Sequence, residues 1–188
     1  MASSNVSLIN HFLIAAPTLQ DPSFTNAVIY MCEHHNKGAA GLIINRPLYS
    51  SMHMIFKQLH IDLDKSRAKT PPLLFGGPYA ANRGFVIHRP NGAWNSSIIL
   101  RNDVTITTSN DIIEAIANSK GPQDALITLG YTLWSENQLE QEIMENKWLV
   151  CPFKTEILYE VPFAERWHYS GLTIGVKMNQ LLTNIGHA

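Results

Sequence analysis

Short apolar runs rich in β-branched residues recur along the chain between turn-forming residues, and this pattern constrains the fold more than any other feature. Runs this short are typical of strands in a sheet. They lie at Phe12–Ala16, Ala27–Cys32, Gly41–Asn45, Leu73–Phe75, Phe85–His88, Ser97–Leu100, Val104–Thr107 and Ala125–Leu129. Loop-forming residues separate them, for example at Asp21-Pro22 and Pro90-Asn91-Gly92. We therefore predict that a sheet forms the centre of the fold.

Helical periodicity is present in segments between these strands. Apolar residues fall on one face of Met52–Leu59 and of Ser109–Ala117, and Ser109 is a suitable N-cap for the second segment. Further along, Ser135 and Gln138 have the spacing of a capping box, which predicts a third helix. Because these helices do not alternate regularly with the strands, an all-parallel sheet is not indicated.

The chain is long enough for one substantial hydrophobic core. It has 188 residues, of which 45% are hydrophobic and 15% are charged, and no repeat or linker divides it. We predict a single α+β domain over residues 1–188, with a mixed, largely antiparallel sheet and flanking helices. Residues 1–7 are expected to form a flexible N-terminal tail.

The charge and cysteine content exclude several functions. The chain has 14 Lys and Arg against 15 Asp and Glu, so its formal net charge of -1 creates no positive field for DNA or anionic lipid. It has no apolar run long enough to span a membrane and no secretory signal. The two cysteines, Cys32 and Cys151, cannot provide a disulfide framework. We expect a cytoplasmic protein with no specific DNA binding and no membrane binding.

The segment Cys32-Glu33-His34-His35 is the cluster that most suggests chemistry. If the strand continues through it, the side chains of Cys32 and His34 share a face. A neighbouring imidazolium would lower the thiol pKa, so Cys32, with His34 and His35, is a candidate reactive thiol. The alternative is a small buried residue at a strand end. A zinc site would need a further ligand such as His88, so we predict neither a metal nor another cofactor.

The turn Phe75-Gly76-Gly77-Pro78 follows a predicted strand. Exposed backbone amides at Gly76 and Gly77 would be able to hold an anion, which makes this turn a weak candidate site. Its sequence matches neither a P-loop nor a dinucleotide-binding motif. The alternative is a structural turn that needs the conformational freedom of glycine.

Aromatic and polar residues are interleaved between the last predicted strand and the third helix. Tyr131, Trp134, Ser135 and Gln138 form a candidate binding surface there, because Tyr and Trp dominate interface hot spots. In this prediction the Trp134 ring is partly exposed beside a polar rim. The alternative is that Trp134 covers the edge of the core.

Ordered blocks of sequence extend over nearly the whole chain. They are HFLIAAPTLQDPSF at His11–Phe24, VIYMCEHHNKGAAGLIINRPL at Val28–Leu48, FGGP at Phe75–Pro78, RGFVIH at Arg83–His88, ITTSNDIIEAIA at Ile106–Ala117, and LGY with QLEQEI within Leu129–Ile143. Together they resemble the AlgH/YqgE family of bacterial proteins. The resemblance implies a compact mixed-sheet domain, and Cys32 matches the cysteine of the family's CEH block. The chain departs from the family after Tyr131, where Leu133-Trp134-Ser135 replaces a glycine-rich turn.

The family name derives from a proposed role in transcriptional regulation of alginate synthesis. With no catalytic signature in the sequence, this resemblance favours a non-enzymatic regulatory or adaptor protein that acts through an unknown protein partner. Any effect on transcription would then be indirect, because no DNA-binding motif is present. The alternative is a thiol-dependent redox sensor or enzyme centred on Cys32.

Overall fold

The computed structural model describes residues 7–48, 52–58, 60, 71–101 and 103–185. Its strands are β1 (His11–Ala15), β2 (Val28–His35), β3 (Gly38–Ile43), β4 (Leu73–Phe75), β5 (Tyr79–His88), β6 (Ser97–Arg101), β7 (Val104–Thr107), β8 (Ala125–Ser135) and β9 (Trp148–Pro152). They form one sheet in the order β6-β7-β5-β8-β3-β2-β1-β9, with β4 beside β8. β4 and β8 are parallel, and the other pairs are antiparallel. This confirms the predicted mixed, largely antiparallel sheet.

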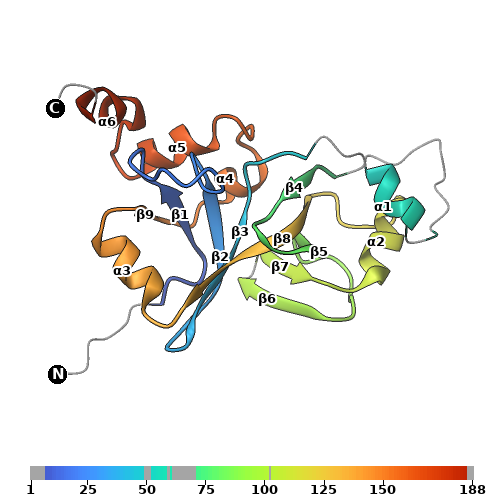
Figure 1. Ribbon diagram of the computed structural model, residues 1–188. Helices are drawn as coiled ribbons and strands as arrows, with labels where there is room; N and C mark the ends of the chain where they lie inside the picture. The colour runs from blue at the N-terminus through green and yellow to red at the C-terminus, as the bar shows by residue number, and fades with distance from the viewer. Residues whose placement is uncertain (1–6, 49–51, 59, 61–70, 102, 186–188) are drawn as a thin grey trace.

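Helices flank the sheet at both ends (Figure 1). They are α1 (Met52–Gln58), α2 (Asn110–Ala117), α3 (Gln138–Met144), α4 (Thr155–Tyr159), α5 (Arg166–Thr173) and α6 (Met178–Ile185). The predicted α+β class is confirmed, although β9 and α4–α6 were not predicted. The predicted flexible tail lies outside the described residues except for Ser7, as does Leu59 of the first predicted helix. In the described part of the chain, no helix is long and apolar enough to cross a membrane.

Strand β8 joins the two ends of the sheet. Its first half pairs with β4 and β5, and its second half pairs with β3 (Figure 1). Between these halves, Gly130 has a φ of 73°, and a Cβ there would lie 2.3 Å from the carbonyl oxygen of Gly77. Only glycine fits this close approach. Position 130 of β8 therefore requires glycine, and the predicted strand Ala125–Leu129 is only the first half of β8.

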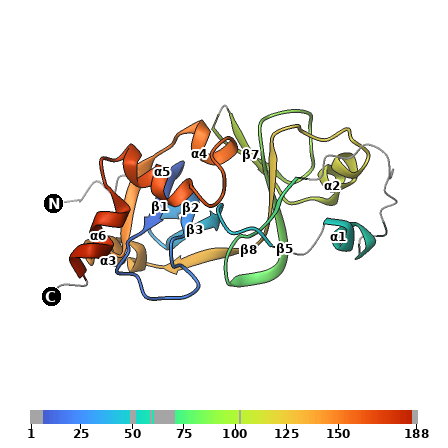
Figure 2. The same cartoon turned by 90° about the horizontal axis from the view of Figure 1, so that it is seen from above.

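The buried side chains form three clusters around the sheet. The first lies between β1–β3 and helices α4–α6, which cover one face of these strands (Figure 2), and it extends to residues of β4, β5, β7 and β8. It includes Phe12, Tyr30 and Trp167, and the indole Nε1 of Trp167 donates to the Ala15 carbonyl at 2.8 Å. The second cluster lies on the opposite face against α3, and the third packs α1 and α2 against β4, β5 and β8. Each face of the sheet is thus held by separate helices.

Two predicted helix starts differ in detail from the structure. Ser109 is the N-cap of α2, but its hydroxyl lies between the Asn95 carbonyl and the Asp111 carboxylate and donates its one hydrogen there instead of capping the first turn. Ser135 is still part of β8, because it pairs with Gly38 of β3, so α3 begins later than predicted. Gln138 accepts hydrogen bonds from the Ser135 N–H and hydroxyl at 3.0 Å, which is one half of the predicted capping box.

Candidate functional site

The structure corrects the prediction that Cys32 and His34 share a face. The β2–β3 register shifts between Met31 and Glu33, so a β-bulge interrupts the alternation of side chains at Cys32. Cys32 and Glu33 both line a cavity on one face. On the other face, the imidazole of His34 accepts from the Leu8 N–H at 3.0 Å and contacts the Glu140 carboxylate at 2.9 Å. The bulge therefore separates the thiol from this histidine.

The environment of Cys32 does not activate its thiol. Burial raises the pKa of Cys32 well above its ordinary value, and the neighbouring Glu33 carboxylate raises it further. The thiol donates to the Tyr30 carbonyl at 3.5 Å, whereas the His35 ring accepts from the Lys37 N–H in the exposed hairpin turn. The thiol hypothesis requires a lowered pKa. This geometry gives that hypothesis no chemical support.

His88, considered above as a further metal ligand, does not line the cavity that contains Cys32. It is buried on β5, between the Thr107 hydroxyl at 2.9 Å and the Arg89 carbonyl at 2.8 Å. Burial lowers the pKa of His88. Among the described residues, no three His, Cys, Asp or Glu side chains are grouped as metal ligands.

The Gly76-Gly77 turn has the geometry of a structural turn, the alternative considered above. The Gly76 N–H donates to the Leu129 carbonyl at 2.7 Å, and both glycines are buried. A Cβ on Gly77 would lie 2.2 Å from the Tyr131 carbonyl oxygen. The two glycines are needed because the turn packs directly onto the backbone of β8, so Gly76 has no free amide for a ligand.

The predicted partial exposure of Trp134 is corrected by the structure, in which this side chain is buried. Its side chain is 4% exposed and packs against Trp148, with ring centroids 5.8 Å apart. The Glu142 carboxylate accepts from the indole N–H groups of Trp134 and Trp148 at 2.9 and 2.8 Å. Because side chains alternate along β8, Leu133 faces outward in place of Trp134. Ser135 and Gln138 are exposed at the end of this strand and do not line the cavity.

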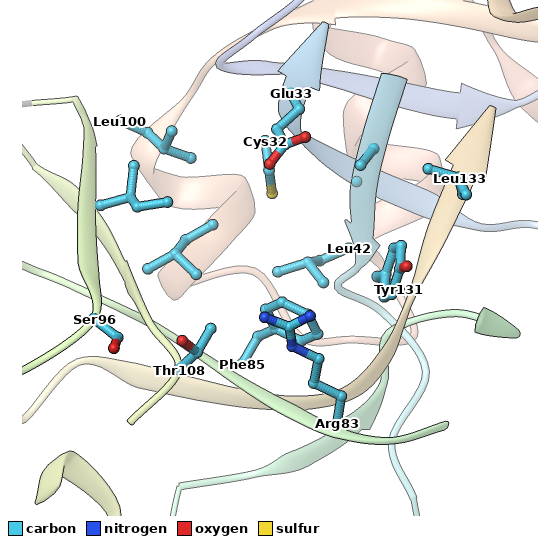
Figure 3. A pocket seen from close by; sticks show the side chains of 14 residues that line it. Cys32, Glu33, Leu42, Arg83, Phe85, Ser96, Leu100, Thr108, Tyr131 and Leu133 are labelled. Atoms are coloured by element: carbon cyan, nitrogen blue, oxygen red, sulfur yellow. The ribbon is translucent and has the colours of Figure 1, made fainter. Parts of the chain in front are cut away.

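The main cavity lies where the curled sheet brings its edge strand β6 opposite β2 and β3 (Figure 3). Its volume is about 470 Å³, and its walls are mainly apolar. The lining residues are Cys32, Glu33, Ala40, Gly41, Leu42, Arg83, Phe85, Ser96, Ile98, Leu100, Ile106, Thr108, Tyr131 and Leu133. Pockets of roughly 300–1,000 Å³ are typical of ligand sites. Of the predicted site residues, only Cys32 and Tyr131 are brought together here.

The edge strand beside this cavity is unusually apolar and open. Within the described residues β6 pairs only with β7, and its Ile98 and Ile99 are 60% and 71% exposed. Ile98 lines the cavity, whereas Ile99 follows it on the strand and faces the other way. Sequence reasoning placed a strand here but missed that it is an edge. An open edge strand with exposed apolar side chains is a template on which another chain can pair.

The curled mixed sheet with flanking helices defines an α+β architecture that known proteins share. A family model described as AlgH-like matches residues 12–179. The chain therefore belongs to the AlgH-like family, which confirms the resemblance seen in the sequence. A UPF0301 protein of Legionella pneumophila is 59% identical over 182 residues, 97% of each chain. A UPF0301 protein of Dechloromonas aromatica is 41% identical over 184 residues, 98% of this chain and 99% of the relative.

Solved structures of similar chains agree with this assignment. The solution structure of the AlgH protein from Pseudomonas aeruginosa is 38% identical and superposes with a TM-score of 0.80, covering 100% of both chains. A crystal structure of a protein from Corynebacterium diphtheriae gives a TM-score of 0.72 at 18% identity, over 96% of this chain and 94% of that one. The second likeness concerns the fold alone.

Proposed function

We propose that this protein is a non-catalytic adaptor or regulatory protein that binds an extended segment of a partner protein along β6. The observation that carries the proposal is the open edge of β6, with Ile98 and Ile99 exposed on its two faces. An edge strand presents unpaired backbone N–H and C=O groups, and an extended peptide pairs with them by adding a strand to the sheet.

The opposite edge of the same sheet is protected in the ways that edges usually are. Strand β9 ends at Pro152, contacts α3 and α5, and contains the buried Trp148. On β6 the only charged residue is Arg101, at its last position. Because folded proteins normally block such an edge, the difference between β9 and β6 supports a binding role for β6.

The remaining properties of the chain fit a cytoplasmic adaptor. Cys32 and Cys151 are free thiols, as is usual in a reducing compartment. The formal net charge of -1 offers duplex DNA little electrostatic attraction. In this proposal, any effect on transcription is therefore indirect and passes through the protein partner.

Affinity capture from the native cytoplasm tests the proposal when edge and control variants are compared. The edge variant is Ile98→Lys with Ile99→Lys, because lysines on an edge strand block strand addition. The control is Met144→Lys, which replaces a side chain that is 75% exposed on α3. We expect the edge variant to lose the partner captured by the wild type and the control to keep it, with the thermal midpoint of each changed by only a few degrees. Equal capture by all three proteins would contradict the proposal.

A further inference from the structure

The cavity beside β6 has one cationic end and one anionic end. Arg83 projects into it from β5, with its guanidinium 5.4 Å from the centre of the Phe85 ring, and Glu33 projects from β2 on the other side (Figure 3). Neither side chain makes an ion pair with another described residue. Both charges are therefore available to a bound molecule.

These two ends correspond to the two ends of β6. Val86 pairs with Thr107, which brings Phe85 beside Thr108, and the Thr108 N–H donates to the Ser96 carbonyl at 3.2 Å. The Arg83 end of the cavity therefore lies at the start of β6. At the other end of the strand, the Leu100 carbonyl accepts from the Asn10 side chain at 2.9 Å.

Asn10 also fixes where Glu33 lies relative to β6. Its backbone N–H donates to the Met31 carbonyl at 3.0 Å, and its side chain accepts from the Tyr30 hydroxyl at 2.8 Å. Because Asn10 connects this part of β2 to Leu100, Glu33 lies near the end of β6 (Figure 3). The same contact closes that end of the edge, which leaves Ser97–Ile99 as the open stretch.

Between the two charges the cavity wall is apolar. Leu42, Ile98, Ile106 and Leu133 contribute to it from β3, β6, β7 and β8. An added strand directs alternate side chains toward one face, so its apolar residues would enter the cavity at every second position. Antiparallel addition is favoured because antiparallel pairs are slightly more stable, residue for residue, than parallel ones.

We infer that β6 binds a segment of fixed polarity, with a basic residue toward its N-terminal end, alternating apolar residues in the middle and an acidic residue toward its C-terminal end. An antiparallel strand on β6 begins near Glu33 and ends near Arg83, so this order pairs each charge of the cavity with its opposite. The inference rests on the proposed function and adds the chemistry of the partner segment. Such exposed charges select the direction of binding more than they raise the affinity.

Two short peptides of one composition test the polarity. Both have blocked termini and alternate Leu and Thr in the middle. One has Lys near its N-terminus and Glu near its C-terminus, and the other has these two residues exchanged. Each peptide is titrated into the protein, and binding is measured by NMR from chemical-shift changes of the isoleucine methyl groups. The first peptide should bind about tenfold more tightly than the second, because each exposed ion pair changes the affinity by a few-fold.

Charge-reversal variants show whether Arg83 and Glu33 cause the preference. The double variant Arg83→Glu with Glu33→Lys should prefer the second peptide. Lys120→Glu makes the same change of charge as Arg83→Glu at an exposed site that does not line the cavity, and it should keep the wild-type preference. Circular dichroism verifies that each variant is folded.

Several results would overturn the inference. These are equal binding of both peptides, no binding by the wild type at millimolar peptide, or a preference that survives the double reversal. Self-association of the wild type that the first peptide cannot displace, detected by sedimentation, would assign the edge to a second copy of this chain. If the peptides do not show the predicted preference but partner capture still depends on Ile98 and Ile99, only the inferred polarity of the bound segment would be rejected. Capture that is independent of β6 would reject the proposed function itself.

Discussion

Glu142 shows how a single carboxylate stabilises two large buried side chains. One of its oxygens accepts from the indole N–H groups of both Trp134 and Trp148, which are 4% and 2% exposed. Without this acceptor, two buried donors would be left without a partner, and each costs about 1–3 kcal/mol.

We therefore predict that Glu142→Ala lowers the free energy of unfolding by about 2–6 kcal/mol. Glu136→Ala serves as the control, because Glu136 is exposed in the turn after β8. It should change stability by no more than about 0.5 kcal/mol. Denaturant unfolding of both variants measures the difference. Equal midpoints would show that the indoles do not depend on Glu142.

The two thiols lead to a second prediction at this scale. Burial raises the pKa of Cys32 well above its ordinary value and raises that of Cys151 to about 11. Since the thiolate is the reactive form, both residues should be labelled much more slowly than free cysteine at pH 7 in the native protein, and rapidly after unfolding. Labelling of native Cys32 with an apparent pKa below about 8.5 would instead restore the redox hypothesis.

At the scale of elements, β8 passes directly against the turn at Gly77 where its two halves meet, at Gly130. Gly130 and Gly175 have similar φ values of 73° and 76°, but they differ in their surroundings. A Cβ on Gly130 would meet the Gly77 carbonyl oxygen at 2.3 Å, whereas one on Gly175 has nothing within 4 Å. A comparison of the two glycines therefore distinguishes two contributions to the loss of stability on substitution. Both positions have a left-handed backbone, but only Gly130 is also crowded.

Substitution of each glycine by alanine makes this comparison. Gly175→Ala should lower the free energy of unfolding by about 1–2 kcal/mol, which is the usual penalty of a left-handed conformation for a residue other than glycine. Gly130→Ala should lower the free energy of unfolding by clearly more than Gly175→Ala, because the backbone of β8 must also move away from the turn at Gly77. Thermal or denaturant unfolding tests the order. A smaller loss for Gly130→Ala would mean that β8 does not need glycine at this close approach.

Some elements could be predicted from the sequence and others could not. The apolar runs of the central strands predicted their positions because buried strands have a strong local pattern. Helix α5 was missed because its sequence mixes polar and aromatic residues, and burial of Arg166 and Trp167 depends on contacts with distant strands. The bulge at Cys32 and the exposure of Ile98 could not be predicted from the sequence either. Both depend on which strands pair, and local spacing does not contain that information.

At the scale of the whole molecule, side-chain contacts beside the cavity connect the two ends of the sheet. The Asp103 carboxylate accepts from the Thr155 hydroxyl at 3.0 Å, and the Arg101 guanidinium lies 4.3 Å from the centre of the Phe153 ring. With the Asn10–Leu100 hydrogen bond, these contacts connect the β6–β7 hairpin to the opposite end of the fold. The cavity is thus part of the folded structure before any partner binds.

Because His88 is buried, we predict that the free energy of unfolding depends on pH. Its pKa in the folded state is lowered by burial, while the unfolded chain has a value of about 6.5. As the pH falls through 6.5, the unfolded state takes up a proton that the folded state does not, so stability falls until the pH passes below the folded pKa. Unfolding measured between about pH 5 and 8 should show this slope, and His88→Gln should reduce it. An identical slope in the variant would assign the effect to other groups.

Amide hydrogen exchange tests the central claim, the availability of β6 as a binding edge, most directly. In the free protein, amides of β6 that do not pair with β7 should exchange much faster than those of the inner strands β3 and β8. After addition of the captured partner, exchange should slow most strongly within Ser97–Arg101 and in the cavity wall around Leu133. Unchanged exchange in β6, with new protection confined to other elements such as α3 or α5, would contradict the account.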